Sequence, residues 1–189
     1  MNEQEILRQQ VATERRHLAQ VRNACEAALA AALEEAVLDG FCQCCAGYLV
    51  YIVARFNAQD QMHAQLLGPR LGPADASFRP MLAELEATLA SSRSAIARLG
   101  KALEARRGGR ATASEFILET KTYIDYFNQV LRRRQNTITP LLERLYTIVD
   151  WRAACMVTAD SILEEREQYG RVELRLPAGI ELKSSGRPS

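Results

Sequence analysis

Residues 41–69 read FCQCCAGYLVYIVARFNAQDQMHAQLLGP and carry the clearest structural signal of the chain. Mostly apolar side chains recur there at alternating intervals of four and three residues, which places them on one face of an α-helix. The face consists of Cys45, Leu49, Ile52, Phe56, Gln59, His63 and Leu66. Gly68 and Pro69 end the pattern, so the sequence predicts a helix over 41–67.

The same alternation continues in two later stretches. One follows Leu82, Leu85, Leu89, Ser92, Ile96, Leu99 and Leu103, and the other follows Ile117, Thr120, Ile124, Phe127, Leu131, Arg134, Ile138, Leu141 and Leu145. With Gly and Pro as turn markers, the sequence predicts helices over 3–38, 41–67, 77–105, 113–145 and 151–169. Asp39-Gly40 and Gly108-Gly109 are the expected breaks, Thr112 to Glu115 form a capping box, and Pro140 should kink its helix or split off the last turn.

Long helices with short connections pack antiparallel in sequence order. We therefore expect an all-α protein: an antiparallel up-down-up-down four-helix bundle with a short fifth helix. Residues 1–169 form the predicted bundle, and residues 170–189, with their prolines and glycines, form a predicted extended or mobile C-terminal tail.

Composition narrows the function classes. The 189 residues include 48% hydrophobic and 25% charged residues, an ordinary globular balance, and the net charge is +1. This balance gives no reason to expect nucleic acid or anionic membranes as partners. The longest strong apolar run is far shorter than a membrane span, and the N-terminus is polar and acidic, so we expect a cytoplasmic protein.

The five cysteines fit that location as reduced thiols. Cys42 and Cys45 lie three residues apart and share a helix face, where they are expected as small core residues. Binding of a soft metal such as Cu(I) is the alternative. The role of the Cys42/Cys44/Cys45 group is left open.

Polar residues interrupt the helix faces that are predicted to be buried. Gln59, His63 and Arg134 lie on these faces, and Glu14 and His17 lie beside the apolar face of the first predicted helix. If the first turn is at Asp39-Gly40, His17 and His63 stand level along the helices, with Glu84 and Arg134 at a similar height. The sequence thus predicts a polar core layer that includes Gln59, Glu84 and Arg134.

Two segments have the spacing of metal ligands. Glu14 and His17, and likewise Asp60 and His63, place a carboxylate and an imidazole three residues apart on one helix face. Such donors suit non-haem iron, manganese or zinc. Arg134 would repel a cation, however, so a salt-bridged layer without metal is the favoured alternative.

The stretches 131–151 and 56–69 resemble the ligand-bearing helices of hemerythrin-like (HHE cation-binding) domains, through the Pro140-Leu-Leu segment, the Asp150-Trp151 pair and the helix around His63. This resemblance implies an up-down-up-down bundle whose family holds a di-iron centre with His and carboxylate ligands. His17 would stand for the first-helix histidine, and Asp60 or His63 for second-helix ligands. Asn57, Ser92 and Arg134-Gln135 occupy positions where further ligands are expected, so the implied centre is degenerate.

We therefore expect a hemerythrin-like binding, sensor or interaction module of bacterial type, without an intact di-iron centre, without a cofactor and not an enzyme. The alternative is a non-haem metal-binding protein that senses iron, O2 or redox state, or an oxidoreductase, and uses Glu14, His17, Asp60 and His63. The partner is a protein or a small ligand that the sequence does not identify. Trp151 and the apolar face after it are expected to pack across the bundle, with a homodimer contact as the alternative.

Overall fold

The computed structural model describes residues 2–131 and 139–183. Its helices are α1 (Glu3–Ala30), α2 (Glu35–Leu67), α3 (Arg79–Arg107), α4 (Ala113–Tyr126), α5 (Thr139–Leu145), α6 (Ile148–Cys155) and α7 (Ala159–Leu174). Short 3-10 turns span Gly68–Arg70 and Pro73–Phe78, and a π-helical turn, Phe127–Leu131, extends α4. No β-strand occurs in the described ranges, which confirms the all-α prediction.

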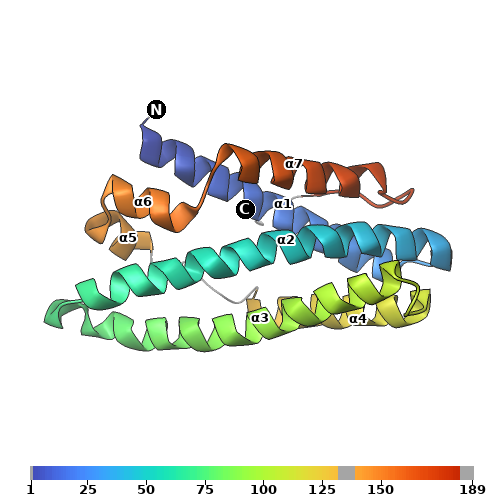
Figure 1. The fold of residues 1–189 in the computed structure, drawn as a ribbon, viewed down its shortest axis with the longest axis horizontal. Helices are drawn as coiled ribbons and strands as arrows, with labels where there is room; N and C mark the ends of the chain where they lie inside the picture. The colour runs from blue at the N-terminus through green and yellow to red at the C-terminus, as the bar shows by residue number, and fades with distance from the viewer. Residues whose placement is uncertain (1, 132–138, 184–189) are drawn as a thin grey trace.

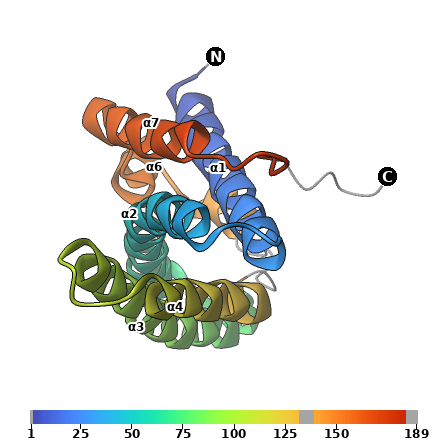
Figure 2. The same ribbon diagram turned by 90° about the vertical axis from the view of Figure 1, so that its right-hand side faces the viewer.

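Helix α2 lies at the centre of the molecule (Figures 1 and 2). Seen end-on, it separates the pair α3 and α4 from a second group formed by α1, α6 and α7. It contacts α1, α3, α4, α6 and α7. The placement agrees with its sequence, because the helix that touches most of its neighbours should also be the most apolar one.

The buried apolar side chains form two clusters along the long axis. The larger cluster is built on α1–α4 and includes Val21, Leu49 and Ile52. The smaller one gathers Leu7, Leu67, Leu82, Leu141 and Trp151 near α5 and α6. Along α1 and α2, buried polar residues lie between them: Glu14 on α1, and Asn57, Gln59 and His63 on α2. These buried polar residues form a polar layer between the two apolar clusters.

The turn between α1 and α2 is not where the sequence places it. Residues 31–34 make the turn, and Asp39 and Gly40 lie inside α2. Asp39 is buried and its carboxylate accepts hydrogen bonds from the Arg106 guanidinium at 2.9 and 3.0 Å. Because this acid has a fixed partner near the start of the helix, where negative charge is also favourable, it stays helical. The prediction of a break at Asp39-Gly40 was wrong.

The predicted helix 113–145 is interrupted in the structure. The Thr112 capping box is confirmed, with Glu115 accepting from the Thr112 backbone amide and hydroxyl at 2.8 Å. Gly109 precedes it in the left-handed region, at a φ of 67°. Helix α4 and its π-turn end at Leu131, and α5 resumes at Thr139, directly before Pro140, as expected of a proline near a helix start. Arg134 lies outside the described residues.

The predicted fifth helix is two helices, α6 and α7, separated by Met156 in the left-handed conformation. Trp151 is buried in the smaller cluster, as expected for packing across the bundle. Ala154 is also buried, whereas Leu163 is exposed. Helix α7 continues past the predicted boundary at 169 to Leu174. Beyond it, Leu176, Ile180 and Leu182 pack against the larger cluster.

One helix of the described part, residues 35–70, is long and apolar enough to cross a membrane by length and composition. Half of its most apolar window is buried inside the protein. The central helix of a protein core meets the same criteria, so this is weak evidence for a membrane span.

Candidate buried polar site

An ion pair crosses from α1 to α2 in the polar layer. Arg55 Nη2 donates to the two carboxylate oxygens of Glu14 at 2.9 and 2.8 Å. Gln10, one turn earlier on α1, donates to Oε1 of the same carboxylate at 3.0 Å. Glu14 is fully buried and the Arg55 side chain is 10% exposed, so both charges have left water and depend on each other.

A second buried carboxylate, Glu165, enters from α7. Its Oε1 lies 2.9 Å from His17 Nδ1 and accepts a hydrogen bond of 2.8 Å from the Tyr48 hydroxyl. His17 belongs to α1 and Tyr48 to α2, so one carboxylate joins three helices. Glu165 is 1% exposed and the His17 side chain 22% exposed.

The electrostatics of this group follow from burial and pairing. Burial alone would raise the pKa of Glu165, but the hydrogen bonds from His17 and Tyr48 outweigh it and lower the pKa below its ordinary value. Burial, together with the negative charges of Glu165 and Glu14, raises the pKa of Tyr48 well above its ordinary range. Tyr48 is therefore a neutral donor and Glu165 an ionised acceptor at neutral pH.

Further contacts of α7 with α1 and α2 are also polar or aromatic. The Tyr169 hydroxyl donates to Gln20 Oε1 at 2.9 Å, and its ring stacks on the His17 imidazole with centroids 4.0 Å apart. The Tyr51 hydroxyl donates to the Ser161 carbonyl at 2.9 Å. On α7 the fully buried residues are Glu165 and Val172. The helix is thus held by directional contacts around one carboxylate together with the apolar packing of Val172 in the larger cluster.

His63 belongs to a different group near α5 and α6. Its Nδ1 lies 2.9 Å from the Tyr146 hydroxyl, and the two rings stack at 5.6 Å. Tyr146 in turn meets Trp151 edge-on. Burial lowers the pKa of His63, opposed by Asp60 and assisted by Arg15, so the imidazole is neutral at neutral pH.

The observed register separates the two histidines. Because Glu14 of α1 pairs with Arg55 of α2, the antiparallel helices place residue 52 opposite His17. His63 lies 11 residues farther along α2, roughly 16 Å at the helical rise. The prediction that His17 and His63 stand level was wrong, because it rested on the misplaced first turn.

The other residues that were predicted for the polar layer differ in their burial. Gln59 is buried and donates to the Cys155 carbonyl, which ties α2 to the end of α6. Asp60 is half-buried. Glu84 is exposed on α3, so its assignment to the core layer was wrong.

Glu14, His17, Asp60 and His63 do not fit a di-iron centre. In the described ranges no three His, Cys, Asp or Glu side chains form a group that could hold a metal ion. Glu14 is occupied by Arg55, His17 by Glu165, and His63 by Tyr146. A guanidinium within hydrogen-bond distance of a carboxylate ligand would also repel a dication.

Several buried polar atoms in or beside the layer have no hydrogen-bond partner among the described residues. They include Nε and Nη1 of Arg55, Asn57 Nδ2 on α2 and Ser92 Oγ on α3. Asn57 and Ser92 occupy positions where the resemblance implies ligands. A neutral amide and a hydroxyl in place of imidazoles leave little affinity for iron.

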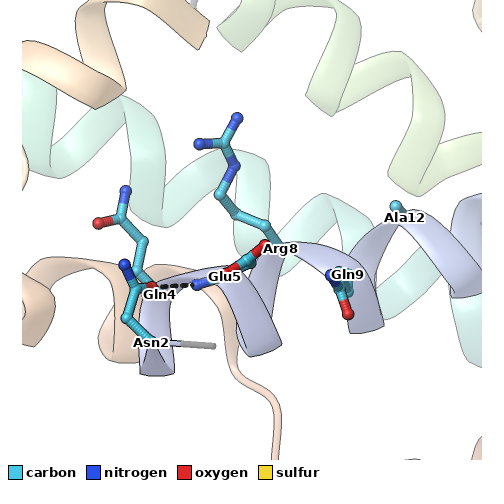
Figure 3. Close-up of a pocket in the computed structure, with 6 residues that line it drawn as sticks. All are labelled: Asn2, Gln4, Glu5, Arg8, Gln9 and Ala12. Atoms are coloured by element: carbon cyan, nitrogen blue, oxygen red, sulfur yellow. Dashed lines mark hydrogen bonds between the residues drawn. The ribbon is translucent and has the colours of Figure 1, made fainter.

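A shallow hollow runs along the first turns of α1 (Figure 3). Its lining residues Asn2, Gln4, Glu5, Arg8, Gln9 and Ala12 all come from this helix or its cap. Asn2 accepts a hydrogen bond from the Glu5 amide, an ordinary N-cap. Among the described residues, α1 and its cap supply all the lining groups, so no functional side chains from different elements converge there within that part of the chain.

Sequence reasoning missed Arg55, Tyr48, Glu165 and Tyr146. One signal was available in α7, where Glu165 lies four residues before Tyr169 and seven before Val172, on the apolar face of an amphipathic helix. Arg55 was similarly marked as a charge within the apolar run 48–56.

Comparison with known proteins gives no match to any family model, curated protein or solved structure.

Proposed function

We propose that this chain is a helical binding or sensor module rather than an enzyme. Its response to a signal is a shift in the equilibrium between α7 docked on α1 and α2 and α7 released from them. The observation that carries the proposal is Glu165, a fully buried carboxylate of α7 whose hydrogen-bond partners His17 and Tyr48 stand on two other helices.

Because the docked face of α7 carries a carboxylate, the docking of α7 depends on the hydrogen-bond donors of that carboxylate. Burying an ionised carboxylate without partners is strongly unfavourable, so α7 docks stably only while its donors are in place. Few fully buried apolar side chains support the helix otherwise, which is typical of elements that open before the rest of a fold. An input that weakens the bonds to Glu165 would therefore release α7 and uncover Tyr48 and Tyr51 to a partner.

The scaffold of this proposal is an antiparallel up-down-up-down bundle of α1 to α4, with α7 as an added helix against α1 and α2. This keeps the architecture implied by the resemblance to hemerythrin-like domains and omits their di-iron centre. Glu14 and Arg55 then have a structural role, which is to hold α1 and α2 in register.

Hydrogen–deuterium exchange tests the proposal. Glu165→Ala should remove protection from residues 159–174 and increase exchange around His17 and Tyr48, while α3 and α4 keep theirs. Glu167→Ala is the matched control, since Glu167 is an exposed carboxylate on the same helix that pairs with Arg171. It should leave α7 protected.

Two results would contradict the proposal. Unchanged protection of α7 in Glu165→Ala would show that docking does not depend on the carboxylate. A uniform loss of protection over all helices would show that α7 is an inseparable part of the core and not a releasable element.

A further inference from the structure

The short link between α6 and α7 contains a strained residue (Figure 1). Met156, directly after α6, has a φ of 51° and is the only non-glycine residue with a positive φ in the described part of the chain. This left-handed conformation is unfavourable for a residue with a Cβ atom. Met156 is 41% exposed and Thr158 is also exposed, so the link is free to straighten without disturbing the core.

The local sequence does not require a break at this link. Glycine and proline, the strongest signals for the end of a helix, are absent from residues 148–169. Helix α7 begins with a polar cap, in which the Ser161 amide donates to Thr158 Oγ1 at 3.1 Å and the Thr158 amide donates to the Ser161 hydroxyl at 2.9 Å. If Met156 adopts the ordinary helical conformation, residues 148–174 can form one continuous helix, and this cap is no longer needed.

The contacts that hold α7 can also be made by a second molecule. Helix α7 packs chiefly against α1 and α2 rather than against α6. The Glu165 carboxylate is hydrogen-bonded to His17 and Tyr48, and the nearer of these two partners is 117 positions away in the chain. Since no such contact depends on the link, a second copy of the chain offers α7 the same partners in the same arrangement.

The surface that α7 covers is specific in what it accepts. An occupant must bring an acceptor for the donors on α1 and α2, a ring that stacks on His17 and an apolar side chain for the larger cluster. Glu165, Tyr169 and Val172 supply these three groups at intervals of four and three residues, on one helix face. Another copy of α7 therefore matches the surface.

We propose that two copies of this chain exchange α7, so that residues 148–174 form one helix in each copy and each α7 docks on α1 and α2 of the other. The inference rests on the proposed release of α7 and names the partner of the surface that release uncovers. Exchange keeps the contacts of docked α7 and relieves the strain at both Met156 residues. Mass action favours the exchanged dimer at high protein concentration.

The oligomeric state after refolding tests the proposal. The full chain is refolded from urea at low and at high protein concentration, and its mass is measured by size-exclusion chromatography with light scattering. We expect a monomer at low concentration and a dimer at high concentration. In the dimer, the Val157 amide should gain protection from hydrogen exchange, because it then lies inside a helix.

Variants of the link should shift the equilibrium in opposite directions. Met156→Gly should lower the association constant of the dimer at least about tenfold, because glycine adopts the left-handed conformation readily and so favours the monomer. Thr158→Ala should raise it about tenfold, because only the monomer needs the cap of α7. Thr147→Ala is the matched control. Thr147 caps α6, which both forms retain, so this variant should leave the association constant unchanged.

Mixing two variants distinguishes exchange from ordinary dimerisation. Glu165→Ala lacks the carboxylate of α7, and His17→Ala lacks one of its partners. In an exchanged dimer of one chain of each kind, one docking site is intact and the other carries both defects. Because the two groups are in contact, the doubly defective site loses less than the sum of the single losses. Native mass spectrometry with one chain isotope-labelled should therefore show more mixed dimers than random pairing gives.

Three outcomes would count against these ideas in different ways. If the wild type and Thr158→Ala stay monomeric at high concentration while α7 is released in Glu165→Ala, the exchange is overturned and the proposed function stands. A dimer that is equally stable in all link variants, or random pairing in the mixture, would identify an ordinary dimer and also overturn the exchange. Full protection of α7 in Glu165→Ala would contradict the proposed function and the exchange together.

Discussion

Arg55 donates to both oxygens of Glu14 from one nitrogen, Nη2, at 2.9 and 2.8 Å across the α1–α2 interface. The pair lies between two apolar clusters, so a shift of either helix along the other would leave one charge buried without its partner. The contact therefore contributes to the register of the two helices as well as to their stability.

Breaking this pair from one side should be strongly destabilising. We expect Arg55→Met to lower the free energy of unfolding by about 3–5 kcal/mol, because Glu14 would remain a buried charge without its cationic partner. The double variant Glu14→Leu/Arg55→Met should recover most of the loss, since no charge then stays buried. Urea denaturation of the wild type, both single variants and the double variant measures the coupling. Additive losses would contradict a directly coupled pair.

The helices themselves were predictable because their side chains repeat at intervals of three and four. Leu49 and Ile52 of the first quoted stretch are fully buried, as the pattern indicates. The first turn was not predictable in the same way. Residues 31–34 read Ala-Ala-Leu-Glu and carry no turn signal, whereas Asp39-Gly40 carries a strong one that its contact with Arg106 overrides.

The misplaced first turn also made the predicted arrangement of site residues wrong. Displacing the turn changes which residues of α1 and α2 face each other, so Glu14 meets Arg55 and His17 is far from His63. The partners of His17 depend in addition on where α7 lies. Its docking position is set by contacts between residues more than 100 positions apart, such as Tyr48 and Glu165, which local patterns do not encode.

Acid should release α7. The pKa of Glu165 is lower in the folded protein than in the unfolded chain, so its contribution to stability is fully present above about pH 4.5 and is lost as the pH falls through the folded pKa. The protection factors of the α7 amides, measured from pH 6 downwards and corrected for the intrinsic pH dependence of exchange, should fall as the pH drops below about 4.5. Glu165→Gln should weaken docking at pH 6 and flatten the dependence. An equally steep dependence in that variant would assign the effect to other carboxylates.

The neutral Tyr48 hydroxyl should also stabilise the docking of α7, through its hydrogen bond to Glu165. Tyr48→Phe leaves the packing of the ring intact and removes one of the two donors to Glu165, which should lower the free energy of α7 docking by about 1–3 kcal/mol. Tyr51→Phe removes a hydrogen bond to a backbone carbonyl of the same helix and should have a smaller effect. Equal effects of the two variants would contradict the central role of the carboxylate.

His63 should make the free energy of unfolding depend on pH in a higher pH range than Glu165 does. Burial lowers its pKa when folded, so the unfolded chain binds the proton first and stability falls as the pH drops below about 6.5. Thermal unfolding of His63→Gln between pH 5 and 8 should lack this component. Tyr146→Phe, which removes the hydroxyl beside Nδ1, serves as a comparison that keeps the titrating group. No difference in slope between wild type and His63→Gln would contradict the buried neutral imidazole.

Metal analysis separates the proposed module from the metalloprotein alternative. Because Glu14, His17 and His63 each hold a protein partner and the two histidines lie far apart along the helices, we expect far less than one equivalent of iron, manganese or zinc in protein purified from iron-supplemented cells. His63→Ala, measured alongside, should give the same background value. A near-stoichiometric metal that disappears in His63→Ala would contradict this expectation. It would require His63 to leave Tyr146 and the helices to rearrange around a site that brings Asp60 and further donors together.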